Sequence, residues 1–113
     1  MKYLVSIHRP QGYDHSKMID TEVIQAIDAV NDEMMAAGVR VFVCGLGSPS
    51  SATSIHHRDD GEVMVEDGPF LKTSEYVDGF WVLDCVSQDE AVEWGRKAAL
   101  ACRGSVEVRP LAG

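Results

Sequence analysis

Several stretches of this sequence are typical of β-strands that are apolar on both faces, and this pattern limits the folds open to the chain. In the clearest of them, Phe80 and Val82 point to one face, whereas Trp81, Leu83 and Cys85 point to the other. A sheet with one face in water normally alternates apolar and polar side chains. Both faces of this sheet therefore need a covering layer.

Two amphipathic helices are predicted, and they would supply one of these layers. The first begins after a cap at Asp20 or Thr21 and ends at Gly38. Its apolar side chains recur at helical spacing on one face: Val23, Ile27, Val30 and Met34. The second helix opens with Ser87 and Glu90, which have the spacing of a capping box.

The order of elements predicts the fold. Strands are expected over residues 2–8, 39–44, 52–58, 62–66, 79–86 and 105–109. The two strands in the middle surround Asp59-Asp60-Gly61, which is a hairpin turn signal. Each helix connects two strands, so both helices should cover the same face of one sheet. We therefore expect a single domain over residues 1–113, with an α+β, ferredoxin-like βαββαβ sandwich and an inserted hairpin.

The sheet face without helices is expected to meet a second copy of the chain. The first two strands are also largely apolar on both faces, and the few polar residues in such a face, Ser6, His8 and Asp84, would be interface groups or the lining of a cleft. An exposed apolar patch of this size exceeds what a soluble monomer normally tolerates. The sequence thus predicts a homodimer in which sheet faces sheet.

Charge and cysteine content restrict the partners. The 113 residues carry 10 basic and 18 acidic side chains, a net charge of −8, which argues against nucleic acid and anionic membranes as partners. No apolar run approaches the length of about 18 residues that a membrane span needs. The three cysteines form no C-x-x-C pair, so we expect no zinc site. Free cysteines are typical of a reducing compartment, and we expect a cytoplasmic protein. We expect no other metal and no cofactor.

Three motifs carry a resemblance to a known family. They are the stretch Glu66-Asp67-Gly68-Pro69-Phe70-Leu71-Lys72-Thr73-Ser74-Glu75, the strand that begins Gly79-Phe80-Trp81, and the ending Gly104-Ser105-Val106-Glu107-Val108-Arg109-Pro110. In this order they resemble the DGPF branch of the YCII-related (YciI-like) family. The resemblance covers essentially the whole chain and implies ferredoxin-like subunits that pair as a dimeric α+β barrel. Some members of the wider family are proposed to use a His–Asp pair with the histidine in the first helix, but residues 20–37 contain no histidine here.

Asp67 and His8 are the candidate catalytic residues. Asp67 begins the DGPF turn, where a carboxylate either accepts backbone N–H groups as a structural element or acts as a general base at the mouth of a cleft. His8 ends the first strand and would face either the helices or the cleft. Its imidazole is the type of group that moves a proton near neutral pH.

The candidate ligand-binding residues are Lys72, Glu75, Phe70 and Trp81. Lys72 and Glu75 either form a solvated ion pair or leave Lys72 free to bind a carboxylate. Phe70 and Trp81 would pack against a ligand, and core or interface packing is the alternative for Trp81. The adjacent His56 and His57 should point to opposite faces of a short strand, and His15 falls in a predicted loop without an evident partner.

These observations leave two functions open. The first is a homodimer with a cleft for a small polar molecule and acid–base catalysis of the lyase or isomerase type. The second is a non-catalytic module that binds a ligand or a protein, in an accessory role beside transcription factors. The sequence contains no Walker motif, dinucleotide loop or G-x-S-x-G elbow that would point to another chemistry.

Overall fold

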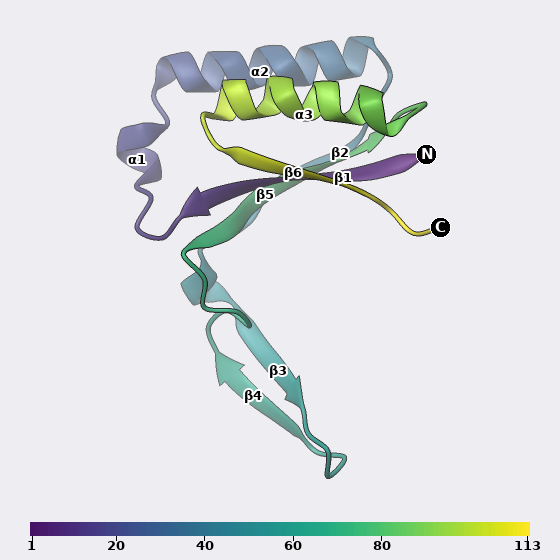
Figure 1. Ribbon diagram of the computed structural model, residues 1–113. Helices are drawn as coiled ribbons and strands as arrows, with labels where there is room; N and C mark the ends of the chain where they lie inside the picture. The colour runs from purple at the N-terminus through teal and green to yellow at the C-terminus, as the bar shows by residue number, and fades with distance from the viewer.

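Four strands form one antiparallel sheet in the computed structural model, which describes all 113 residues (Figure 1). They are β1 (Lys2–Pro10), β2 (Arg40–Gly45), β5 (Glu75–Asp84) and β6 (Ser105–Pro110). Their order across the sheet is β2-β5-β1-β6. Each helical connection skips one strand, so that β1 lies between β5 and β6 and β5 lies between β1 and β2. This arrangement is ferredoxin-like, and the predicted α+β fold is confirmed.

Two long helices, α2 (Thr21–Ala36) and α3 (Gln88–Cys102), cover the same face of this sheet (Figure 1). The Asp20 carboxylate caps α2 by accepting a hydrogen bond from the Val23 N–H at 3.0 Å. The Ser87 hydroxyl caps α3 by accepting one from the Glu90 N–H at 3.2 Å. Both caps were expected from the sequence, and they satisfy N–H groups that have no partner inside the helix. No helix in the structure combines the length and apolar character needed to cross a bilayer.

The hydrophobic core lies between the sheet and these helices. Tyr3, Val5, Trp81 and Leu83 point toward the helices and are almost completely buried. The Trp81 indole N–H donates a hydrogen bond to the Asn31 side-chain oxygen on α2 at 3.0 Å, so its polar edge is satisfied. The core is thus made by one face of the central strands.

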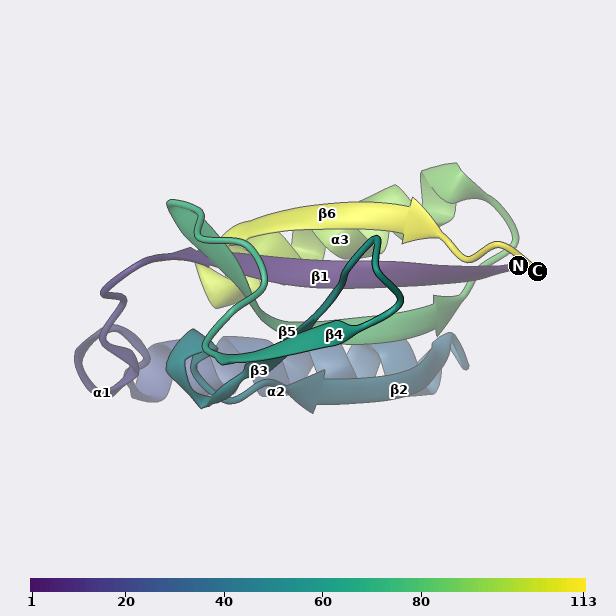
Figure 2. The same ribbon diagram turned by 90° about the horizontal axis from the view of Figure 1, so that it is seen from below.

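The inserted hairpin, here called the arm (residues 53–67), leaves the sheet on the side opposite the helices. It consists of β3 (Thr53–His57) and β4 (Val63–Asp67), and a 3-10 turn, η1 (Pro49–Ser51), precedes it. β3 and β4 pair only with each other, as a separate two-stranded sheet. Figure 2 views the molecule from the arm side, so the arm lies in front of the sheet and the helices lie behind it.

The structure also differs from the sequence prediction in two places. A short helix, α1 (His15–Met18), forms in the segment expected to be a loop, because the Asp14 carboxylate caps it by accepting the Ser16 N–H at 3.0 Å. Strands β1 and β5 are longer than predicted and pair as far as Pro10 and Glu75. A bulge in β5, where Asp78 is an extra residue opposite the step from Ile7 to His8 of β1, lets this pairing continue.

The two ends of the chain lie side by side at the end of the sheet that is farthest from α1, where β1 begins and β6 ends (Figures 1 and 2). The Leu111 N–H donates a hydrogen bond to the Lys2 carbonyl oxygen at 2.9 Å. The N-terminal ammonium group lies 3.1 Å from an oxygen of the Asp84 carboxylate. The first and last strands are therefore tied together beside the end of β5.

Candidate functional site

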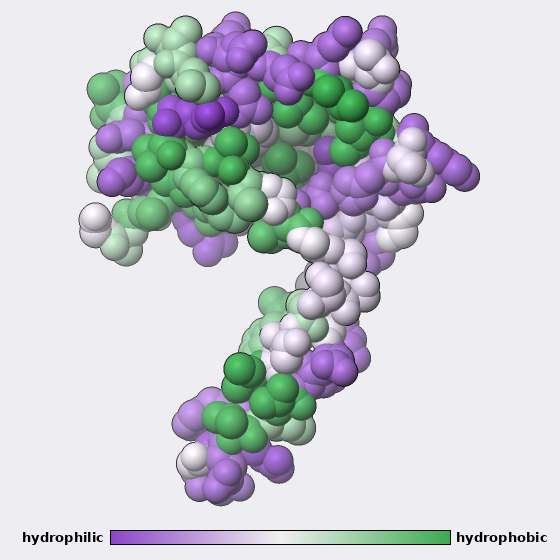
Figure 3. All heavy atoms as spheres, turned by 180° about the vertical axis from the view of Figure 1, so that it is seen from behind, coloured by the Kyte–Doolittle hydropathy of each residue, from purple (hydrophilic) through white to green (hydrophobic).

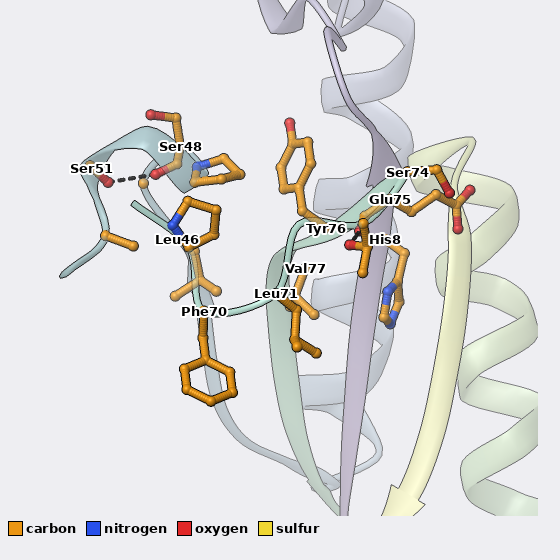
Figure 4. A pocket seen from close by; sticks show the side chains of 15 residues that line it. His8, Leu46, Ser48, Ser51, Phe70, Leu71, Ser74, Glu75, Tyr76 and Val77 are labelled. Carbon is orange, nitrogen blue, oxygen red and sulfur yellow. Dashed lines mark hydrogen bonds between the residues drawn. The ribbon is translucent and has the colours of Figure 1, made fainter. Parts of the chain in front are cut away.

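A cavity of about 710 Å³ lies where the arm joins the sheet (Figure 4). Three segments line it: the adjoining ends of β1 and β5, the turn before the arm, and the DGPF turn with the residues that follow it. The walls combine apolar side chains with several hydroxyl groups. This volume lies within the range of about 300–1,000 Å³ that is typical of small-molecule sites.

His8 forms part of the cavity wall on the sheet side. It lies on the face of β1 that points away from the helices, because it is in register with Val77 of β5 and both side chains line the cavity. The His8 Nε2 atom lies 3.1 Å from the hydroxyl oxygen of Ser6, two residues earlier on the same face. This contact fixes the ring while leaving it at the cavity.

Glu75 and Tyr76 begin β5 and place ionisable groups beside the cavity. Figure 4 shows Glu75 and His8 on the sheet side, across the cavity from Phe70. Burial, and secondarily the Asp78 carboxylate, raise the pKa of the Tyr76 phenol above its ordinary value, so it stays protonated at neutral pH. Tyr76 is in register with Arg9, so its phenol turns toward Arg9 and Asp78 and its strand segment, more than its hydroxyl group, borders the cavity. The walls therefore offer a carboxylate and an imidazole.

Phe70 connects the cavity to the arm. Its ring lines the cavity on one side and stacks on the His56 imidazole of β3, with 4.9 Å between ring centroids and 20° between ring planes. The His56 Nε2 atom lies 3.3 Å from a carboxylate oxygen of Glu66 on β4. His57, the next residue, is exposed and makes none of these contacts. The DGPF turn is thus anchored to one face of the arm.

The structure brings together some of the predicted site residues and separates others. His8, Glu75 and Phe70 line the cavity. Asp67 and Lys72 are exposed and lie outside its walls, and no ion pair joins Lys72 to Glu75. Trp81 is buried in the core on the opposite face of the sheet and does not reach the cavity.

The conformation of the DGPF turn does not depend on the Asp67 carboxylate, which accepts no hydrogen bond in the structure. Two other groups stabilise the turn. The Ser54 hydroxyl donates a hydrogen bond to the Gly68 carbonyl oxygen at 2.7 Å, and the Gly68 N–H donates one to the Ala52 carbonyl oxygen at 2.7 Å. Ser54 is the one buried side chain of the arm.

A second polar cluster lies on the helix side of the sheet, and sequence reasoning missed it. The His15 Nε2 atom of α1 lies 2.9 Å from both carboxylate oxygens of Asp78, the extra residue in the β1–β5 pairing. Asp78 also lies 3.5 Å from the Arg9 Nε atom. The sequence places Asp78 directly before the predicted strand over residues 79–86, and nothing local points to His15, its distant partner on α1.

Arg9 joins this cluster to the end of α3. Its Nη1 atom donates hydrogen bonds to the carbonyl oxygens of Cys102 at 2.6 Å and Arg103 at 3.2 Å. A cation at this position complements the partial negative charge of the helix C-terminus. A Cβ atom at Gly104 would lie 2.8 Å from Arg9 Nη1, so the close approach of the guanidinium requires glycine there. This cluster does not line the cavity.

The arrangement around the cavity supports proton transfer and hydrogen bonding. An imidazole and a carboxylate are groups that can act as acid or base, and the hydroxyl groups of the turn before the arm are able to donate and accept hydrogen bonds. In that turn, the Ser51 hydroxyl donates to the Ser48 carbonyl oxygen at 2.6 Å. No Lys or Arg side chain lines the cavity, and no group of three or more His, Cys, Asp or Glu side chains in the structure is arranged to hold a metal ion.

Comparison with known proteins agrees with the fold and the motifs. The family model described as YCII-related domain matches residues 1–112. An uncharacterized protein of Rhizobium meliloti (strain 1021) is 39% identical over 99 residues, which cover 86% of this chain and 79% of that protein.

Proposed function

The chain belongs to the YCII-related family, and on this premise we propose that it is a small cytoplasmic homodimer whose cavity binds a small polar molecule. The observation that carries the proposal is the cavity of about 710 Å³ with His8 and Glu75 in its walls. Three free cysteines agree with a reducing compartment.

The lining favours a ligand that is neutral or carries a positively charged group. Glu75 supplies a negative charge, and no lysine or arginine offsets it at the cavity wall. Phe70, Leu71 and Val77 provide apolar surface for the body of the ligand. Lys72, which was a candidate for binding a carboxylate, lies outside these walls, so an anionic ligand has less support.

For catalysis, we assign proton transfer to His8 and the carboxylate role to Glu75. Both side chains border the same space, whereas Asp67, the carboxylate favoured by the sequence, does not. An imidazole and a carboxylate flanking a bound substrate suffice for removing a proton at one atom and returning it at another. This is the chemistry of a lyase or an isomerase.

Binding without turnover is the second candidate function, in a ligand-dependent interaction module accessory to transcription regulation. One observation favours it: the group in hydrogen-bond contact with His8 is Ser6, which is buried and does not line the cavity. No nucleophile activated by a base therefore faces the ligand space.

The proposal is tested by a thermal-shift screen of small polar molecules against the wild-type protein, His8→Ala, Glu75→Gln and His57→Ala. His57 is the matched control, because it is an exposed histidine outside the cavity. A true ligand stabilises the wild type and His57→Ala but not the cavity variants. Equal stabilisation of all four proteins would place the ligand elsewhere.

Turnover of such a ligand distinguishes the two functions. A bell-shaped dependence of the rate on pH, abolished in His8→Ala, is expected for acid–base catalysis. Binding that depends on His8 without any turnover would support the interaction module instead.

A further inference from the structure

The arm is poorly supported by its own chain. Its strands contact each other and no other helix or strand to a comparable extent. Ile55, Val63 and Val65 lie on one face of the arm and are 62%, 58% and 63% exposed. An isolated two-stranded hairpin is marginally stable in water. The straight, well-formed arm therefore requires a surface on which to pack.

The helix-free face of the sheet is also uncovered. Phe42 is 52% exposed, and its ring centroid lies 5.9 Å from that of Phe80 on the neighbouring strand. Leu4 and Val82 continue this apolar surface across the centre of the sheet. At the β6 edge the surface becomes polar, where Arg109 and Glu107 form an ion pair at 2.8 Å. The apolar part of the face is thus confined to β2, β5 and β1.

The size of the molecule shows how much surface is left uncovered. The chain exposes 7493 Å², whereas a compact monomer of this mass exposes about 6,100 Å². Its radius of gyration is 16.1 Å, against about 13 Å for a compact chain of this length. The excess, about 1,400 Å², exceeds the roughly 800 Å² that each partner contributes to a standard interface. A second copy of the chain is an occupant of adequate size.

We infer that two copies exchange arms: the arm of each protomer packs against the sheet of the other, and the partner fills the open angle between arm and sheet. Figure 3 shows this angle, with apolar side chains along the middle of the arm. The cavity opens into the same angle, between the base of the arm and His8. The sheet of the partner therefore closes the open side of the cavity, so each binding site is complete only in the dimer.

This inference rests on the homodimer of the proposed function and adds that each arm packs on the sheet of the other protomer. Cross-linking tests this contact directly. Ile55→p-benzoylphenylalanine places a photoreactive group on the arm. In a mixture of isotope-labelled and unlabelled chains, we expect cross-links between chains that map to β1, β2 or β5. Cross-links confined to one chain, or none, would overturn arm exchange. The same group at Leu100, which is 76% exposed on α3, is the control and should give no cross-link between chains.

Molecular mass in solution separates the failure of this inference from the failure of the dimer. Ile55→Ser/Val65→Ser on the arm and Phe42→Ser on the sheet should each raise the dimer dissociation constant at least about tenfold, whereas Leu100→Ser should leave it unchanged. A dimer that Phe42→Ser weakens and the arm variant does not would retain the homodimer and overturn arm exchange. A monomeric wild type would overturn both.

The composite cavity has its own measurement. Nile red, a neutral apolar dye, should bind to the wild-type dimer and lose fluorescence in the arm variant, although every cavity residue is unchanged there. His8→Ala reports whether the dye occupies the cavity. Undiminished fluorescence of a monomeric arm variant would show that the partner forms no wall of the site.

Discussion

Arg9 connects three parts of the molecule through one side chain. It is buried, donates to the last carbonyl oxygens of α3, and lies beside Asp78 on β5. Its guanidinium carbon also lies 4.5 Å from the centroid of the Tyr13 ring, in the segment that leads to α1. The end of the core is therefore organised around a buried cation instead of an apolar group.

Arg9→Met is predicted to destabilise the protein by about 3 kcal/mol, because it leaves two carbonyl oxygens at the end of α3 without their donor and removes the cation beside Asp78, which then keeps His15 alone. Urea unfolding measures the loss. Arg9→Met/Asp78→Asn should recover part of it, since the uncompensated charge is then removed. A double variant no more stable than the single one would show that the Arg9–Asp78 pair contributes nothing.

The two buried thiols predict a loss of stability at alkaline pH. Burial raises the pKa of Cys102, against the effect of the nearby Arg9, and burial followed by the charge of Glu90 raises the pKa of Cys85. In the unfolded chain these thiols ionise near pH 8.5. The folded state holds its protons more tightly, so this contribution is present below that pH and is lost as pH rises toward the folded pKa values.

We therefore expect the urea midpoint to fall as the pH rises above about 8.5. In Cys102→Ala the midpoint at neutral pH is lower, because a buried group is lost, but the alkaline decline is shallower. An unchanged decline in Cys85→Ala/Cys102→Ala would assign it to groups other than the thiols.

At the scale of elements, the DGPF turn offers a paired comparison. Ser54→Ala should cost about 1 kcal/mol, because the partly buried Gly68 carbonyl oxygen loses its hydroxyl donor. Asp67→Asn should change stability by less than about 0.5 kcal/mol, because the carboxylate accepts no hydrogen bond. Thermal unfolding of both variants at pH 7 measures the difference. A larger loss for Asp67→Asn would mean that this carboxylate supports the turn after all.

The elements that the sequence predicts well are those that depend on local chemistry. The periodicity of Val23, Val30 and Met34, and the caps at Asp20 and Ser87, determine the two long helices almost residue by residue. The strand order follows from the way in which the two helices connect the strands, so it can be inferred without knowledge of any contact between distant residues.

The features that escaped prediction depend on residues far apart in the chain. His15 and Asp78 are 63 positions apart, and they meet because a bulge in β5 turns its extra residue, Asp78, toward the helix side. The separation of the two candidate carboxylates has a related cause. Glu75 borders the cavity because it begins β5 and pairs with Pro10 of β1, whereas Asp67 ends β4 at the base of the arm, and no local pattern records these placements.

At the scale of the whole molecule, unfolding should depend on protein concentration. If the arm and the sheet face are stabilised by a second copy, the unfolding temperature rises with concentration, because mass action favours the dimer. Circular dichroism between about 2 and 100 µM measures this dependence. Phe42→Ser should abolish it. A wild-type unfolding temperature that is constant over this range would argue against association through this face.

The meeting of the two chain ends has a consequence for engineering and for gene architecture. Lys2 and Leu111 are hydrogen-bonded neighbours at the edge far from α1, so a short peptide could join them and the chain could be reopened at the arm tip, between Asp59 and Asp60. Such a circular permutant would keep every strand of the sheet and separate β3 from β4 in sequence. The same proximity would let this domain be inserted into a loop of an enzyme or a reporter, because both connections would lie side by side and away from the cavity.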